Sequence, residues 1–204
     1  ATKGDAQRTA DIFNPSTGAV QGKVWLGEAS DVDAAVKAAQ KVQPEWGNTN
    51  PQRRARVMFK YKELLEANLD QVAEEISKQH GKTKEDARGE VIRGIEVVEF
   101  ACGIPHLLRG DYTRNVGPAI DSYSDRQPLG VCAGITPFNF PAMVPMWMFP
   151  MSIACGNTFI LKPSERDPAA PEMLVKLLHD AGMPKGVVNI VNGGKDAVDA
   201  ILTH

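Results

Sequence analysis

A few polar side chains in the second half of the chain directly follow apolar runs, and these are the residues that could do chemistry. Asn139 lies among bulky apolar neighbours in the segment 135–141. A buried amide must find hydrogen-bond partners, so we expect one of two roles for it. It caps a helix that begins at Pro141, or it donates a hydrogen bond to an oxyanion that develops during a reaction.

A charged cluster, 162–166, follows the apolar run 158–161. Charged residues in such a position usually form a solvated loop. At the carboxyl end of a parallel strand, however, Lys162 and Glu165 could bind the hydroxyls of a nucleotide ribose. Glu165 would repel a 2′-phosphate there, so this alternative predicts NAD rather than NADP as the cofactor.

The short motifs that usually reveal a site are absent from the sequence: it contains no GxGxxG, GxxxxGK[ST], HExxH or GxSxG. Cys102, Cys132 and Cys155 lie far apart in apolar stretches, without a CxxC pair or a histidine at metal-ligand spacing. We therefore expect no metal site and no disulfide framework, and a reducing compartment.

Helices are expected to dominate the first half of the chain. Apolar residues recur at helical spacing in three segments. The first begins at Ser30, with Ser30 and Asp33 as a capping box; the second begins after Asn50 and resumes between Asp70 and Gly81. The third runs from Thr83 toward Pro105. Between Gly110 and Pro128 the sequence changes to short alternating pieces among Gly, Pro, Ser and Asp, which predicts a hairpin or an extended arm.

Beyond this arm, short strands are expected at 129–135, 158–161 and 187–191, with helices at 140–155 and 170–181 between them. Such alternation predicts an α/β fold with a parallel sheet covered on both faces and a nucleotide site at the carboxyl ends of the strands. The apolar run 140–155 contains three prolines and is shorter than the roughly 20 residues of a membrane span, so we expect a buried core helix.

Composition excludes several partner classes. The 204 residues carry 23 Lys and Arg against 25 Asp and Glu, a net charge of -2, so we expect neither a nucleic-acid nor a membrane partner. The first ten residues are polar and lack the apolar core of a signal peptide. This predicts a cytoplasmic protein, or one matured after import into the mitochondrial matrix.

The segments 135–141, 155–158 and 161–166 together resemble the aldehyde dehydrogenase superfamily. More narrowly, the stretches 137–141, 147–151 and 162–166 are similar to the coenzyme-A-acylating methylmalonate-semialdehyde dehydrogenases. The likeness extends from Phe13 to the end of the chain and so covers nearly all of it.

The resemblance implies an aldehyde dehydrogenase-like α/β fold in three parts. Residues 1–109 would form the N-terminal helical part of the NAD-binding domain, 110–128 an arm for oligomerisation, and 129–204 the first half of a Rossmann-like parallel sheet. The catalytic domain would be absent. It also implies a homo-oligomer, either a dimer or a tetramer, assembled through the arm.

The activity implied is oxidative decarboxylation of methylmalonate or malonate semialdehyde, a reaction of valine or inositol breakdown. NAD would be the cofactor and coenzyme A the co-substrate, giving propanoyl-CoA or acetyl-CoA. Asn139 would then serve the oxyanion hole rather than cap a helix. Lys162 and Glu165 match the residues that hold the adenine ribose, Arg166 belongs to the same patch, and the backbone around Thr136 and Phe138 would line the nicotinamide side.

Arg93 matches a family position on a helix beside the substrate tunnel, and the family's substrate carries a carboxylate. Its sequence neighbours Ile92, Gly94 and Ile95 are uncharged, which places Arg93 near the apolar face of the helix. An unpaired guanidinium there would cost free energy, and a carboxylate bound in a bidentate manner would offset that cost. The alternative is an arginine that extends from the helix edge toward solvent or pairs with Glu90 or Glu96.

The family's nucleophile is a cysteine thiolate, and none of the three cysteines matches it; we expect all three to be packing residues. In the family pattern the matching cysteine, the general-base glutamate and a glycine-rich turn lie beyond His204, so the 204 residues alone are predicted to be inactive. Two other functions stay open: a hydrolytic NAD-dependent semialdehyde dehydrogenase, and a non-catalytic nucleotide-binding or assembly chain.

Overall fold

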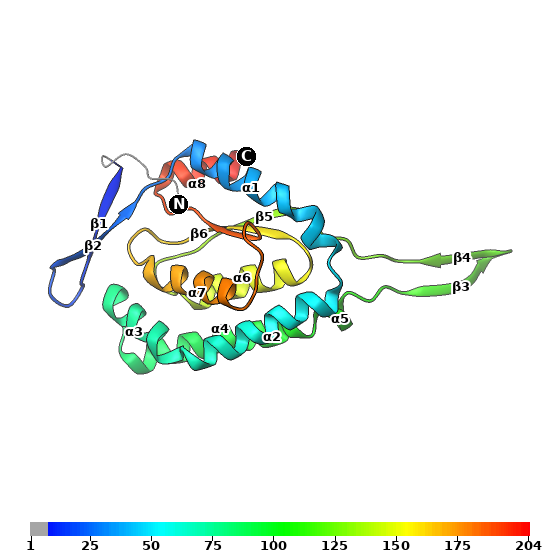
Figure 1. The fold of residues 1–204 in the computed structure, drawn as a ribbon, viewed down its shortest axis with the longest axis horizontal. Helices are drawn as coiled ribbons and strands as arrows, with labels where there is room; N and C mark the ends of the chain where they lie inside the picture. The colour runs from blue at the N-terminus through cyan, green and yellow to red at the C-terminus, as the bar shows by residue number, and fades with distance from the viewer. Residues whose placement is uncertain (1–7) are drawn as a thin grey trace.

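A computed structural model describes residues 8–204 and shows a layered α/β arrangement (Figure 1). Its centre is a parallel sheet of β5 (Val131–Ile135), β6 (Thr158–Lys162) and β7 (Val188–Ile190), in the order β5-β6-β7. Helices α1 and α8 cover one face, and α6 and α7 cover the other, with α2, α3 and α4 forming an outer layer beyond them. The expected parallel sheet with two covered faces is confirmed.

The helices follow the predicted pattern closely. Their bounds are α1 Ala29–Asn48, α2 Pro51–Ala67, α3 Leu69–His80, α4 Lys84–Cys102, α5 Ile104–Leu107, α6 Met143–Ala154, α7 Ala169–Asp180 and α8 Lys195–Thr203. Asn50 caps α2 by accepting from Gln52 N at 2.8 Å, and Thr83 caps α4 by accepting from Asp86 N at 3.2 Å. Both caps agree with the sequence signals.

The predicted capping box of α1 is wrong in its residues. Glu28 is the N-cap, and Asp31, not Asp33, accepts the backbone N–H of Glu28 at 2.9 Å. The helix therefore begins at Ala29, before Ser30, because Glu28 and Asp31, three residues apart on either side of the serine, form the capping box instead.

Two hairpins lie outside the layers. The pair β1 (Thr9–Phe13) and β2 (Val20–Trp25) is antiparallel and was not anticipated, although turn-forming residues separate its two strands. The pair β3 (Tyr112–Gly117) and β4 (Ile120–Tyr123) extends away from the body (Figure 1), so the 110–128 segment takes the hairpin form.

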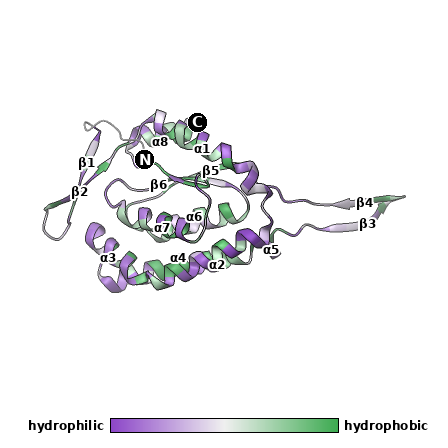
Figure 2. Ribbon diagram, in the orientation of Figure 1, coloured by the Kyte–Doolittle hydropathy of each residue, from purple (hydrophilic) through white to green (hydrophobic). Residues whose placement is uncertain are grey.

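The core fills the space between the sheet and the outer helices, where apolar residues gather along α6 (Figure 2). Phe149 and Ile153 are fully buried there, which confirms a core helix, although Trp147 and Met148 on the same helix are exposed. Helix α4 approaches α6 so closely at Gly94 that an added Cβ would lie 2.1 Å from Met146 Cε. Among residues 8–204, no helix combines the length and the apolarity that crossing a bilayer requires. Residues 1–7, on which the expected compartment partly rests, lie outside the described residues.

Candidate functional site

The carboxyl ends of β5 and β6 place two loops at one edge of the sheet. Ile135 stands opposite Lys162 in the parallel register, and Thr136 N continues the ladder by donating to Lys162 O at 3.0 Å. The loop 136–142 after β5 and the loop 163–168 after β6 therefore leave the sheet together. All five residues assigned to the cofactor lie on or beside these two loops: Thr136, Phe138, Lys162, Glu165 and Arg166.

Lys162 and Glu165 form a partly buried ion pair. Lys162 is only 5% exposed, and its Nζ lies 3.2 Å from Glu165 Oε2. Burial opposes ionisation of Glu165, but its own backbone N–H, Lys162 and Arg166 outweigh that effect and lower the pKa of the carboxyl. A fully solvated loop is thereby excluded, since the site holds a buried ammonium beside an ionised carboxylate.

The neighbouring loop supplies a hydroxyl and an aromatic ring. Thr136 is buried, and its Oγ1 has no hydrogen-bond partner within residues 8–204. Phe138 stacks on the His80 ring with centroids 4.5 Å apart, and the Arg166 guanidinium lies 5.8 Å from the Phe138 ring centroid. Because an orphaned hydroxyl in the interior is unfavourable, Thr136 is a candidate contact for a bound molecule.

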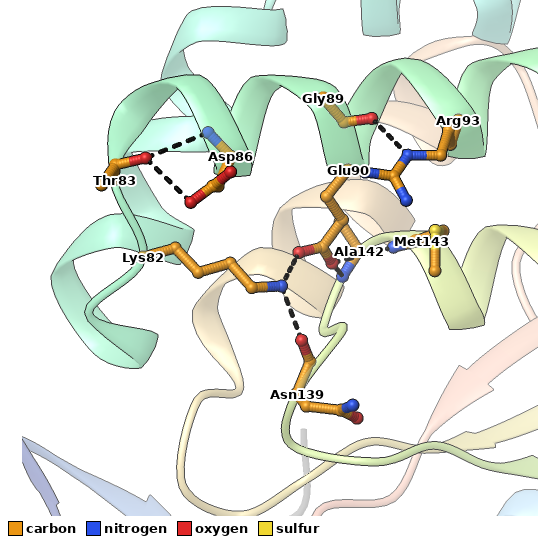
Figure 3. A network of polar contacts seen from close by, with 9 residues as sticks. All are labelled: Lys82, Thr83, Asp86, Gly89, Glu90, Arg93, Asn139, Ala142 and Met143. Carbon is orange, nitrogen blue, oxygen red and sulfur yellow. Dashed lines mark hydrogen bonds and ion pairs between the residues drawn. The ribbon is translucent and has the colours of Figure 1, made fainter.

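Asn139 is exposed, which corrects the expectation that its side chain is buried. Helix α6 begins only at Met143, with Ala142 as its N-cap and no side-chain cap, so the proposed capping role of Asn139 is also wrong. In the described part of the chain the Asn139 amide makes no hydrogen bond; its backbone carbonyl accepts from Lys82 Nζ at 2.5 Å (Figure 3). The side chain points away from that contact and can meet a ligand.

Glu90 and Lys82 are residues whose role the sequence reasoning missed. Glu90 is 1% exposed; its Oε1 accepts from Ala142 N at 2.8 Å and from Met143 N at 3.1 Å, and its Oε2 lies 2.5 Å from Lys82 Nζ (Figure 3). The signal was present, since Glu90 falls on the buried face of α4 beside Val91, where a charge requires a partner.

Arg93 lies one turn beyond Glu90 on α4 and is exposed. Its Nε donates to Gly89 O in its own helix at 3.2 Å, and no carboxylate of residues 8–204 forms an ion pair with it. The alternative in which Arg93 pairs with Glu90 or Glu96 is wrong, because Glu90 pairs with Lys82 and neither carboxylate forms an ion pair with Arg93 within residues 8–204. An arginine that extends to solvent and one that binds a ligand both fit this geometry.

The cysteines occupy packing positions. Cys102 is buried at the end of α4, where its Sγ contacts Val98 O at 3.4 Å and burial raises its pKa to about 11. Cys155 follows α6, and burial raises its pKa as well. Cys132 is half-buried in β5. The first two lack the lowered pKa that marks a reactive thiol.

Asp167 is a further buried group beside the site. It is 1% exposed, and neither carboxyl oxygen has a hydrogen-bond partner in the described structure. Burial raises its pKa to about 7; Glu90 adds to this shift, whereas Ser164 and Lys82 oppose it. The loop after β6 therefore contains an acid whose pKa lies close to neutral pH.

Comparison with known proteins decides the family. The profile of the aldehyde dehydrogenase family matches residues 2–204. The chain belongs to the aldehyde dehydrogenase family. As an aldehyde dehydrogenase, it is 57% identical over 198 residues to the malonate-semialdehyde dehydrogenase of Pseudomonas aeruginosa, which covers 97% of the chain and 40% of that protein. The methylmalonate-semialdehyde dehydrogenase [acylating], mitochondrial, of Arabidopsis thaliana is 52% identical over 94% of the chain and 32% of its own length.

Solved structures of aldehyde dehydrogenases have the same fold. A protein of Sinorhizobium meliloti 1021, complexed with NAD, superposes with a TM-score of 0.96 and 58% identity, covering 98% of the chain and 41% of that protein. The chain thus spans about two fifths of the length of the Pseudomonas and Sinorhizobium proteins. The resemblance inferred from the sequence and the expected fold class are both confirmed.

Proposed function

We propose that this chain is part of a coenzyme-A-acylating dehydrogenase that acts on methylmalonate and malonate semialdehyde and uses NAD. The overall reaction consumes the semialdehyde, NAD and coenzyme A and yields the acyl-CoA, carbon dioxide and NADH. The observation that carries this proposal is that two features lie at one sheet edge: the exposed amide of Asn139, which has no partner among residues 8–204, and the Lys162–Glu165 pair. The names of the two relatives agree with it.

The residues at the sheet edge fit the chemistry of NAD. Lys162 offers a donor and the ionised Glu165 an acceptor, the combination that suits the two hydroxyls of a ribose. Thr136 has a buried hydroxyl that no group in the described part of the chain partners, and Arg166 and the backbone at Phe138 belong to the same two loops. NAD, when bound, accepts the hydride from the substrate. Glu165 would exclude a 2′-phosphate by repulsion, so we propose NAD rather than NADP.

The substrate would meet Asn139 and Arg93. The Asn139 amide would donate to the oxygen on which negative charge develops, an interaction worth about 3 kcal/mol in a dry site. Arg93, which has no carboxylate partner among residues 8–204, would bind the substrate carboxylate in a bidentate manner. None of the three cysteines is proposed as the nucleophile, so we propose that the 204 residues alone are inactive.

Dependence on coenzyme A tests the proposal. Steady-state assays of the full-length protein with malonate semialdehyde should show NADH and acyl-CoA formed in equal amounts, with a rate that depends on coenzyme A. NADH formation that is indifferent to coenzyme A would instead identify the hydrolytic alternative, which releases a free acid. NAD binding without any NADH formation would identify the non-catalytic alternative.

We also propose a homo-oligomer, a dimer or a tetramer, with 110–128 as the contacting arm. The β3–β4 hairpin stands away from the body and exposes Tyr112, Val116, Ile120 and Tyr123, which would be buried against another subunit. The three free cysteines support a reducing compartment, the cytoplasm or the mitochondrial matrix.

A further inference from the structure

The segment 80–82, which joins α3 to α4, contacts three consecutive residues of the loop after β5. His80 stacks on Phe138 with an interplanar angle of 24°, Lys82 Nζ lies 2.5 Å from Asn139 O, and the same ammonium lies 4.0 Å from the Phe140 ring centroid. Gly81 between them adopts φ 88°, a left-handed conformation that favours glycine. The segment thus turns sharply and presents both flanking side chains to the loop.

Glu90 connects this contact to the start of α6. One carboxyl oxygen accepts from the amides of Ala142 and Met143, and the other pairs with Lys82 at 2.5 Å. Lys82 therefore bonds to the loop at Asn139, while its partner Glu90 bonds to the chain three and four residues later, where the helix begins (Figure 3). Both charges are largely buried, with 14% and 1% of the side chains exposed, so their geometry is closely constrained.

This arrangement has a consequence for Asn139. The residue lies outside any helix or strand and its amide bonds to nothing in residues 8–204, so its direction depends on how its backbone is held. Bonding the carbonyl fixes the peptide plane, and with it the direction in which the side chain leaves the loop. An oxyanion donor must be placed within roughly 0.5 Å to be effective.

We propose that Lys82, oriented by Glu90, is a positioning residue that holds the loop so that the Asn139 amide faces the reacting aldehyde. The proposal rests on the oxyanion role of Asn139 in the proposed function. Lys82 makes no contact with the substrate in this scheme and acts only through Asn139.

Hydrogen exchange of the full-length protein tests whether Lys82 holds the loop, and the measurement does not depend on enzyme activity. In Lys82→Met, peptides that cover 138–144 should exchange about ten-fold faster than in the wild type, because Glu90 loses its partner and releases the amides of Ala142 and Met143. Lys84→Met, which removes an exposed lysine two residues away, is the matched control and should leave this exchange unchanged. Unchanged exchange in Lys82→Met would overturn the proposal.

A double-mutant cycle tests whether Lys82 affects catalysis through Asn139. Lys82→Met should lower kcat about ten-fold with a change in the KM for NAD below about two-fold, and Lys82→Arg should recover most of kcat. In the Asn139→Ala background, Lys82→Met should have almost no further effect on kcat. Equal losses in both backgrounds would show that Lys82 acts independently of Asn139 and would overturn the proposal.

The two proposals fail differently. If Asn139→Ala alone leaves kcat unchanged, the oxyanion role in the proposed function is refuted, and with it the catalytic half of this inference. The exchange measurement still decides whether Lys82 holds the loop. Should Lys82→Met fail to fold, Glu90→Gln provides a second variant: it removes the charge that orients Lys82 and leaves only a weaker, uncharged acceptor for the amides of Ala142 and Met143, so exchange of 138–144 should rise and kcat should fall as in Lys82→Met. Unchanged values of both in Glu90→Gln would overturn the proposal.

Discussion

Glu90 Oε1 accepts a hydrogen bond from the backbone N–H of Ala142 at 2.8 Å, across 52 positions of sequence. The first turn of α6 contains no polar residue that could satisfy its own free amides, and Asn139 stands too far before the helix to do so. A carboxylate at a helix N-terminus also interacts favourably with the helix dipole. Helix α4 therefore supplies the cap that the sequence of α6 lacks.

The opposite end of α6 is capped in the same way, and this predicts a stability effect. Trp46 Nε1 donates to Ile153 O, and Arg54 Nε donates to Ala154 O, both at 2.9 Å; Arg54 also bonds to carbonyls at the end of α1. Arg54→Met leaves the carbonyls of Ala154 and of the end of α1 unsatisfied and should destabilise the full-length protein by about 2–4 kcal/mol, seen as a lower Tm in calorimetry. Arg53→Met, at an exposed neighbouring position, should leave Tm nearly unchanged; equal shifts would rule out the capping explanation.

Removing the guanidinium of Arg93 should affect only substrates that carry a carboxylate. In Arg93→Leu, the KM for malonate semialdehyde should rise about ten-fold or more, because a charge-assisted bidentate contact is lost, while the KM for propanal should stay within about two-fold. Arg93→Lys keeps the charge but loses the planar pair of donors, so its KM for malonate semialdehyde should lie between those of the wild type and Arg93→Leu. Steady-state kinetics with both aldehydes makes the comparison, and equal increases would remove Arg93 from the site.

Neutralising Glu165 should weaken the preference for NAD over NADP. In Glu165→Gln the repulsion of a 2′-phosphate disappears, while Lys162 remains as a cation at the same place, so the KM for NADP should fall about ten-fold. The KM for NAD should rise by only a small factor. Asp180→Asn on the exposed side of α7 is a control of equal charge change. If the ratio of the KM for NADP to the KM for NAD is the same in Glu165→Gln and in the wild type, Glu165 does not lie beside the adenine ribose.

Interactions between residues close in sequence could be predicted, whereas those between distant residues could not. Lys162 and Glu165 could be placed at a site because strand ends are encoded locally, by an apolar run followed by polar residues. The cap of α6 could not be predicted, since Glu90 precedes Ala142 by 52 positions and only the tertiary fold brings them together. The alternative that pairs Arg93 with Glu90 or Glu96 considers only residues within one turn of α4, whereas Glu90 pairs with Lys82, which precedes that helix. The β1–β2 hairpin was missed because its exposed strands carry little apolar alternation.

Disrupting the apolar surface of the β3–β4 hairpin should separate the subunits. Val116 and Ile120 are more than half exposed, which is costly unless another subunit covers them. Light scattering of the full-length wild type should give a dimer or tetramer at micromolar concentration, and Val116→Asp with Ile120→Asp should lower the mass by at least half. Phe59→Asp changes an equally exposed apolar residue on α2 and should have no such effect. A monomeric wild type would refute the oligomer.

Asp167 should make stability depend on pH in the direction opposite to that of most carboxyls. Its pKa in the folded protein is raised to about 7, whereas an unfolded aspartate has a pKa of about 3.9. Between these values the folded state retains a proton that the unfolded state has lost, so the contribution of this group to stability falls as the pH rises from about 4 to about 7 and is constant above that range.

Asp167→Asn removes this titration while keeping the size of the side chain. Relative to the wild type, the variant should therefore be more stable at pH 8 than at pH 5, by a difference of up to about 3 kcal/mol, the equivalent of roughly two pH units between pH 5 and the folded-state pKa of about 7. The measurement is the Tm of both full-length proteins at the two pH values, with the exposed Asp180→Asn as the control. A difference in Tm between variant and wild type that is the same at pH 5 and pH 8 would show that Asp167 ionises normally, and that the loop after β6 admits water to its carboxyl.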